Sequence, residues 1–170
     1  MSAPLELNAA RQAFAERAKA GRIVVKIGSG VITDAQARLD VRVLRRLADE
    51  IAPLASAKRW PVVVSSGAIA IGTTVLGLPG RPKTMPGLQA AAAVGQSRLM
   101  EAWADAFRPH ELTVAQVLLT HADVADRRRF LNARRALGEL CAHRVIAIAN
   151  ENDTVSTEEI AFGDNDQLAA

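Results

Sequence analysis

Residues 144–166 read RVIAIANENDTVSTEEIAFGDND, and this stretch decides the fold that the sequence predicts. Its first six residues are apolar apart from Arg144, which is typical of a buried strand. Amides and acids follow at once from Asn150 to Asp153, and they return at 164–166. Open α/β sheets bind ligands just beyond the carboxyl ends of their strands. The stretch therefore favours a ligand site at a sheet edge, with a merely solvated polar loop as the alternative.

Strands and helices alternate through the rest of the chain. The apolar pattern predicts strands at 22–27, 61–64 and 112–119, and helices at 40–58, from 68, at 88–108 and at 127–143. The helix at 40–58 is expected to bend or end near Pro53. This alternation implies right-handed crossovers and a mostly parallel sheet covered on both faces. The predicted fold is therefore α/β, a three-layer αβα sandwich over residues 22–170. Residues 1–21, which are helix-forming up to Gly21, are assigned to an N-terminal helical extension.

The composition excludes several classes of protein. With 170 residues, of which 49% are hydrophobic, the chain can bury a core of its own. No apolar run reaches the roughly 18–20 residues of a membrane span, and the N-terminus does not resemble a signal peptide. Cys141 is the one cysteine, and its apolar helical setting favours a small buried side chain over a nucleophile. These features favour the cytoplasm. A net charge of +3 with 4% aromatic residues gives no nucleic-acid signature.

Lys26 lies in an apolar strand and is followed by Ile27, Gly28, Ser29 and Gly30. A lysine in such a strand must bring its ammonium group to an anion or to the strand's end. Glycines after a strand let backbone N–H groups approach an anion closely. The segment therefore favours a lysine directed at a phosphoryl group, with a lysine at the strand edge as the alternative.

The same glycines are a weak dinucleotide fingerprint. Thr33 occupies the third glycine position, and no helix is predicted to open there. A dinucleotide site also expects an acid that ends a second strand about 20 residues on, whereas Asp49 falls in a helical pattern. An oxidoreductase is therefore disfavoured. The segment is not a Walker A loop either, because G-K-[ST] is missing.

Ser65, Ser66, Gly67 and Ala68 join a strand to a helix. Small side chains leave room for a ligand, and a helix N-terminus favours a carboxylate or phosphate, although an ordinary serine cap has the same pattern. No histidine stands in a relay with either serine, and the three histidines lack metal-ligand spacing, so no metal site is predicted. The basic triplet at 127–129 is typical of a solvated helix start. Acids that face a strand lysine suit phosphoryl transfer, where positioning and charge stabilisation dominate.

Six segments in order now identify a family. They are VVKIGSGVIT (24–33), VVVSSGAIAIG (62–72), QAAAAVGQSRLMEAW (89–103), RRRFLNARRAL (127–137), NENDTVST (150–157) and FGDNDQLAA (162–170). Together they resemble the glutamate 5-kinases of the amino acid kinase family, from about residue 22 to residue 170. The resemblance implies the amino acid kinase fold and the reaction of ATP with L-glutamate to give ADP and γ-glutamyl phosphate, the first step of proline synthesis.

The resemblance also implies roles for particular residues. Lys26 and Asp166 would be catalytic, with Asp166 holding the lysine in place. Lys26, Gly28 and Ser29 would contact the phosphates of ATP. Glutamate would be bound by residues from three segments: Ser66, Gly67, Asn150, Asp153, Asp164 and Asn165. The family uses ATP with Mg²⁺ as co-substrate and has no tightly bound cofactor. The resemblance also implies feedback inhibition by proline and assembly into homo-oligomers.

The sequence departs from the family in three places. Gly30 replaces a serine or another small polar residue, which removes a hydroxyl contact to phosphate. Ala147 replaces a common proline in the last strand. Family members also continue past the GDND segment with the nucleotide-binding part, which is expected to be absent here. The alternative function is therefore a chain that binds glutamate or proline without kinase activity of its own. An incomplete parallel sheet also predicts aggregation or reliance on a partner chain.

Overall fold

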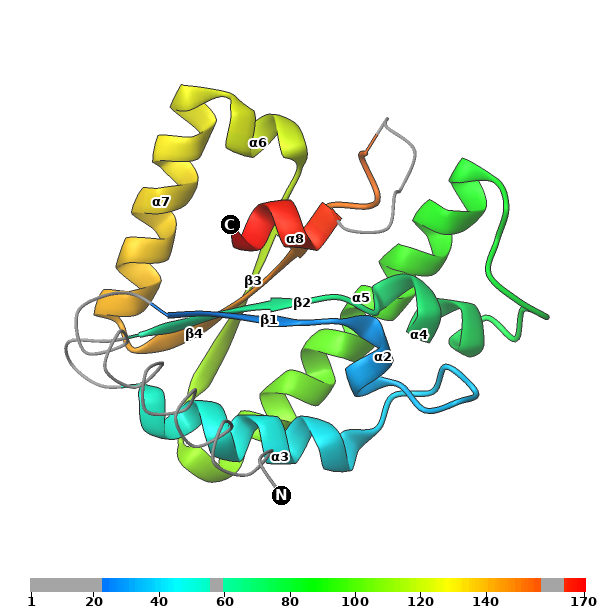
Figure 1. Ribbon diagram of the computed structural model, residues 1–170, viewed down its shortest axis with the longest axis horizontal. Coiled ribbons are helices and arrows are strands. Elements are labelled where there is room, and N and C mark those ends of the chain that lie inside the picture. The colour runs from blue at the N-terminus through cyan, green and yellow to red at the C-terminus, as the bar shows by residue number, and fades with distance from the viewer. Residues whose placement is uncertain (1–22, 56–59, 157–163) are drawn as a thin grey trace, which may run out of the picture.

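A computed structural model describes residues 23–55, 60–156 and 164–170 of the chain (Figure 1). The helical extension expected at 1–21 lies outside these residues. Four strands form one sheet: β1 (Ile23–Ile27), β2 (Pro61–Ser65), β3 (Thr113–Leu119) and β4 (Val145–Glu151). Their order is β1-β2-β4-β3, and every neighbouring pair is parallel. The predicted α/β fold with a parallel sheet is confirmed.

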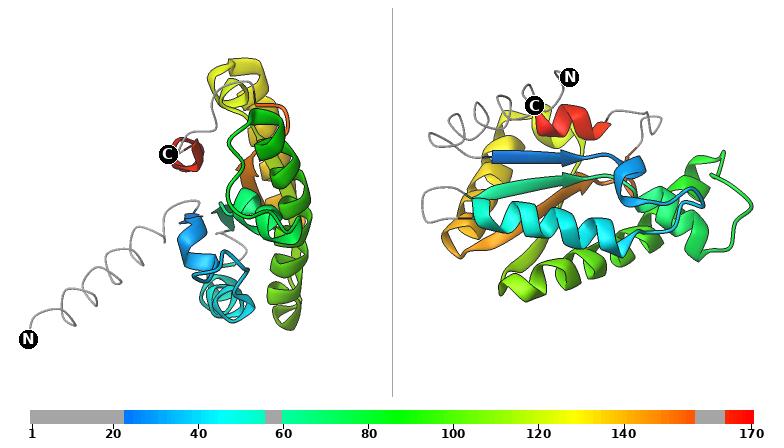
Figure 2. Two further views of the ribbon diagram at one scale, coloured as in Figure 1. Left: turned by 90° about the vertical axis from the view of Figure 1, so that its right-hand side faces the viewer. Right: turned by 60° about the horizontal axis from the view of Figure 1, so that its bottom comes forward.

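Helices lie on both faces of this sheet. The α-helices are α2 (Ser29–Ile32), α3 (Val41–Ile51), α4 (Ala68–Val75), α5 (Met85–Phe107), α6 (His121–Ala125), α7 (Arg127–Ala142) and α8 (Asp164–Ala169). Two 3₁₀ turns, η1 (Ala52–Leu54) and η2 (Arg108–His110), follow α3 and α5. In Figures 1 and 2, α3 and α5 cover one face, while α7 and α8 lie on the other. The chain is thus a three-layer sandwich.

One helical turn was not predicted: Ser29–Ile32 form it, and Thr33 ends it by donating its N–H to the carbonyl of Ser29. The expected bend or end of the first long helix near Pro53 is confirmed, because α3 ends at Ile51 and the next turn, which contains Pro53, is 3₁₀. Proline cannot donate the backbone hydrogen bond that the helix needs at this point. The start of α3 is as expected, since the Asp40 carboxylate accepts from the N–H groups of Arg42 and Val43.

The main core lies between the sheet and the helices α3 and α5. Alternate strand residues point into it, including Val63, Ile146 and Ile148, which are fully buried. Trp103 and Phe107 of α5 stack with their ring centroids 5.7 Å apart. The Trp103 indole N–H donates to the hydroxyl of Ser65 at 3.1 Å, which satisfies a polar group in this apolar region. These contacts hold α5 against the carboxyl half of β2.

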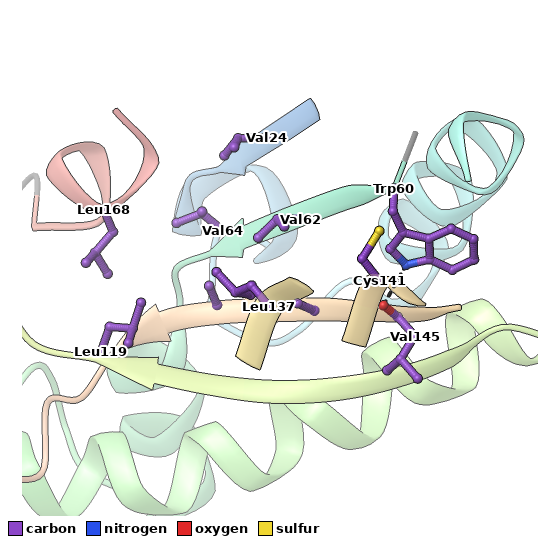
Figure 3. Close-up of a pocket in the computed structure, with 11 residues that line it drawn as sticks. Val24, Trp60, Val62, Val64, Leu119, Leu137, Cys141, Val145 and Leu168 are labelled. Carbon is purple, nitrogen blue, oxygen red and sulfur yellow. Dashed lines mark hydrogen bonds between the residues drawn. The ribbon is translucent and has the colours of Figure 1, made fainter. Parts of the chain in front are cut away.

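The opposite face of the sheet is less completely covered. A cavity of about 200 Å³ lies between this face and the helices α7 and α8. Figure 3 shows the residues that line it. Val62 and Val64 of β2 form its floor, Leu137 and Cys141 of α7 form one wall, and Leu168 of α8 closes another side. Cys141 is half-buried in this apolar lining, in line with its expected role as a small apolar side chain.

Glycines bring α4 and α5 unusually close together. A Cβ atom on Gly72 would lie 1.8 Å from the carbonyl oxygen of Ala91, and one on Gly95 would lie 1.8 Å from that of Ala68. Neither distance is sterically possible, so the two backbones can approach in this way only because both residues lack a side chain. This crossing fixes the start of α4 relative to the middle of α5.

Candidate functional site at the carboxyl edge of the sheet

The ends of three strands meet at one edge of the sheet. In the register, Ile27 pairs with Ser65 and Val64 pairs with Ala149, so β1, β2 and β4 end almost level. The next residues along each strand or loop are Gly28, Ser66 and Asn150. This edge is where open α/β sheets bind ligands, and the predicted site residues Asn150, Asn165 and Asp166 lie there. The helix α8 adds Asn165, which bonds to Ser66 and Asn150, and Asp166, which pairs with Lys26.

Lys26 and Asp166 form an ion pair across this edge. Side chains alternate along β1, so Ile27 enters the main core, while Lys26 points to the face that carries α8. The lysine Nζ lies 2.6 Å from Asp166 Oδ1, and the two side chains are 37% and 62% exposed. A pair this exposed contributes only about 0–1 kcal/mol to folding. Its main consequence is to hold an ammonium group at a fixed point beside the strand ends.

Beside this pair, amide side chains connect β4, α8 and the loop after β2. Asn165 donates through Nδ2 to Ser66 Oγ and to Asn150 Oδ1, both at 2.8 Å. Its Oδ1 accepts from the backbone N–H of Glu151 at 3.1 Å. Asn150 in turn donates through Nδ2 to Gln96 Oε1 of α5 at 2.8 Å. We call these four side chains, Gln96, Asn150, Asn165 and Ser66, the amide network.

Gly67 connects Ser66 to the start of α4. It has a positive φ of 113°, and a Cβ there would lie 3.2 Å from Ile32 Cδ1, so glycine is favoured by conformation as well as by space. Among the described residues, no side chain caps the N-terminus of α4. The backbone N–H groups of the first helical turn are therefore available to an anionic group beside Ser66.

The turn after β1 offers space rather than side chains. Gly28 precedes α2, Ser29 is its first residue, and a Cβ on Gly28 or on Gly30 would meet nothing within 4 Å. A small side chain would therefore fit at either position without a clash. The Ser29 carbonyl is used within the turn, where it accepts from the backbone N–H and the hydroxyl of Thr33.

The remaining predicted residues are placed less fully. Asp153 is about nine-tenths buried in the turn after β4, next to the edge. Asp164 is the first residue of α8, and its side chain lies outside the described part of the structure. Arg127, Arg128 and Arg129 are exposed at the start of α7, where Arg129 pairs with Asp123 of α6. In the described ranges, no group of three or more His, Cys, Asp or Glu side chains could hold a metal ion.

Gln96 was not predicted as a site residue. It lies in a helix whose other inward residues are mainly apolar, and only 8% of its surface is exposed. A buried glutamine needs hydrogen-bond partners, so its position on the apolar side of the helix at 88–108 was the available signal. The sequence could not identify its partner, because Asn150 is 54 residues away.

Comparisons with known proteins identify the family of the chain. A family model described as the amino acid kinase family matches residues 21–170. The chain is 55% identical to a glutamate 5-kinase of Pelobacter propionicus over 152 residues, which are 89% of this chain and 41% of the relative. It is 56% identical to one of Syntrophotalea carbinolica over 149 residues, which are 88% and 40%. The chain therefore spans about two-fifths of the length of these relatives.

A solved structure supports the fold alone. Isopentenyl phosphate kinase of T. acidophilum, in its product complex, superposes with a TM-score of 0.50 at 20% identity. The superposition covers 76% of this chain and 54% of that structure. Among the described residues, no helix combines the length and apolar character that crossing a bilayer requires.

Proposed function

The chain belongs to the amino acid kinase family, and we propose that it forms the glutamate-binding part of a glutamate 5-kinase. The reaction would transfer the γ-phosphoryl group of ATP to the γ-carboxylate of L-glutamate, as the first step of proline synthesis. The amide network beside the Lys26–Asp166 ion pair is the observation that carries this proposal. The identity of 55% to a glutamate 5-kinase supports the choice of substrate.

In the proposed site, the amino acid lies along the edge formed by β2 and β4. The Ser66 hydroxyl and the N–H groups at the start of α4 would bind one carboxylate, with Gly67 allowing close approach. Asp153 and Asn150 would face the ammonium group, because carboxylate and amide oxygens accept its protons. Asp164 and Asn165 would close the site from α8. These contacts would fix the substrate so that its γ-carboxylate points towards Lys26.

Phosphoryl transfer then needs positioning and charge stabilisation. An oxygen of the γ-carboxylate would form a bond to the γ-phosphorus while the bond from that phosphorus to the ADP oxygen breaks. Lys26, held by Asp166, would stabilise the negative charge on the transferring group, and the turn at Gly28 and Ser29 would approach the phosphates. Mg²⁺ would arrive with ATP as the metal–nucleotide complex. No side-chain nucleophile is required, because the substrate supplies the attacking oxygen.

Two regulatory properties belong to the same proposal. Proline would inhibit by occupying a region that overlaps the glutamate site, because it carries the same α-carboxylate and an amino group. The working enzyme would be a homo-oligomer. Titration of proline against bound L-glutamate, and sedimentation equilibrium of the chain, test these two points separately.

The proposed function is tested by calorimetric titration of L-glutamate into the 170-residue chain. We expect binding that is abolished by Asp153→Asn and unaffected by Asp105→Asn, which changes an exposed acid on α5 that pairs with Arg108. Binding without phosphoryl transfer from MgATP would identify a binding module and not a complete kinase. If circular dichroism shows that the chain is folded and it still gives no heat with L-glutamate, the assignment of the amino-acid site to this chain is contradicted.

A further inference from the structure

One backbone donor sets the direction of every hydrogen bond in the amide network. The N–H of Glu151 donates to Asn165 Oδ1, so Asn165 must turn its Nδ2 towards Ser66 and Asn150. Asn150 accepts with Oδ1, and its own Nδ2 therefore points to α5 and donates to Gln96 Oε1. A backbone N–H can only donate, so the network cannot run in the opposite direction.

This direction determines what Ser66 can offer to a ligand. Asn165 uses one Nδ2 proton for Asn150 and the other for Ser66, so Ser66 Oγ accepts a hydrogen bond within the network. Its hydroxyl proton is then left to donate. An oxygen of a carboxylate or phosphate group can accept that proton, whereas an ammonium group cannot. The network thus prepares Ser66 for an anionic group.

Gln96 ends the network in a position where an amide is costly. Its Nε2 is buried and has no hydrogen-bond partner among the described residues. A methionine would fill a similar volume without leaving a buried donor unpaired. Packing therefore does not account for glutamine here, whereas the acceptor that Oε1 offers to Asn150 does. The neighbouring Gly95 holds this part of α5 tightly against α4, which limits the ability of Gln96 to withdraw.

We propose that Gln96 is a positioning residue, which fixes the Asn150 amide and, through Asn165, directs the Ser66 hydroxyl towards the substrate carboxylate. The identity of the ligand as L-glutamate rests on the proposed function. The hydrogen-bonding role of Gln96 does not, because it concerns the chain without ligand. The two statements can therefore fail separately.

Three variants of the 170-residue chain test the role of Gln96. Gln96→Met keeps the length of the side chain and removes the acceptor. Gln96→Glu keeps an oxygen that accepts from Asn150 in either protonation state. Gln116→Met makes the same glutamine-to-methionine substitution at an exposed position of β3 and serves as the matched control.

The first measurement needs no ligand. Hydrogen exchange of side-chain amide protons, followed by NMR, should be at least about tenfold slower for Asn150 and Asn165 than for the exposed Asn132. Gln96→Met should remove most of the protection at Asn150 and shift the Asn165 signals. Gln96→Glu should preserve that protection, and Gln116→Met should leave all these signals unchanged.

The second measurement is the calorimetric Kd for L-glutamate. Gln96→Met should raise it about tenfold, as expected for one lost hydrogen bond, and Gln96→Glu should restore most of the affinity.

Altered exchange in a chain that does not bind L-glutamate would support the positioning role of Gln96 and reject L-glutamate as the ligand. Equal results for Gln96→Met and Gln116→Met in the exchange measurement would overturn the positioning role. Equal losses for Gln96→Met and Gln96→Glu would overturn it as well, since the acceptor would then be irrelevant.

Discussion

Asn165 makes three hydrogen bonds, and aspartate could reproduce only the one that its Oδ1 accepts from the N–H of Glu151. Its Nδ2 donates to Ser66 and Asn150, and an aspartate would place a carboxylate oxygen against the oxygen of Asn150. We expect Asn165→Asp to destabilise the chain by about 1–3 kcal/mol, measured by urea unfolding. Asn132→Asp is the matched control, because Asn132 is exposed on α7 and should change stability by less than about 0.5 kcal/mol. Equal effects of the two variants would contradict the observed network.

The residues at the edge could be predicted from sequence only in part. A lysine within an apolar strand indicated a need for an anionic partner, and the structure provides Asp166, the acid that the family resemblance named. The partners of Asn165 were beyond sequence reasoning. Ser66 is 99 positions away, and its contact depends on the register of β2 and on the path of α8. Asp153, Asp164 and the substrate roles of all these residues remain predictions.

At the scale of elements, the close crossing of α4 and α5 depends on Gly72 and Gly95. We expect Gly95→Ala to destabilise the chain by about 3 kcal/mol, because the new Cβ would force the helices apart by overpacking. Gly80→Ala is the control, since a Cβ there meets nothing within 4 Å. The midpoint of urea unfolding measures both. An unchanged midpoint for Gly95→Ala would show that the helices tolerate a wider separation.

The start of α6 gives a pH dependence with a definite sign. Hydrogen bonds from the backbone N–H and then the hydroxyl of Thr120 hold the pKa of the Asp123 carboxyl below its ordinary value of 3.8. Its folded pKa is lowered, so Asp123 stabilises the chain above about pH 4, and this contribution disappears as the pH falls through the folded pKa.

We therefore expect Asp123→Asn to cost stability near neutral pH and to cost progressively less below about pH 4. Thermal unfolding of both chains between about pH 7 and pH 2 measures this difference. Asp105→Asn on the exposed surface of α5 controls for general effects of acid. A gap between the wild-type and Asp123→Asn chains that stays constant with pH would exclude the capping role.

Most long elements followed from apolar periodicity, whereas the short ones did not. The strands and the helices α5 and α7 lie close to their predicted positions, because each buries a continuous apolar pattern. The single turn of α2 was missed. Its four residues have little helical pattern of their own, and the turn is closed by the Thr33 N–H and hydroxyl, which both donate to the carbonyl of Ser29.

At the scale of the whole molecule, β1 is an edge strand with an exposed valine. Within the described residues β1 pairs only with β2, and Val24 is 46% exposed. Apolar edge strands invite pairing with other chains, so we expect concentration-dependent association in light scattering, and less of it for Val24→Lys. Val155→Lys is the control, because Val155 is 60% exposed but lies in a turn. A strictly monomeric wild-type chain, or equal effects of both lysines, would contradict this role of the edge.

The strand order also has a consequence for synthesis on the ribosome. β4 is the last of the described strands to be made, yet it lies between β2 and β3. Until residues 145–151 emerge, β3 has no strand to pair with, and β1 with β2 is only a two-stranded ribbon, which is marginal alone. We expect stalled nascent chains to become resistant to protease abruptly once β4 has left the exit tunnel, and a gradual rise with length would argue against this. Through most of its translation, the chain would therefore depend on another molecule that covers its unpaired apolar strands.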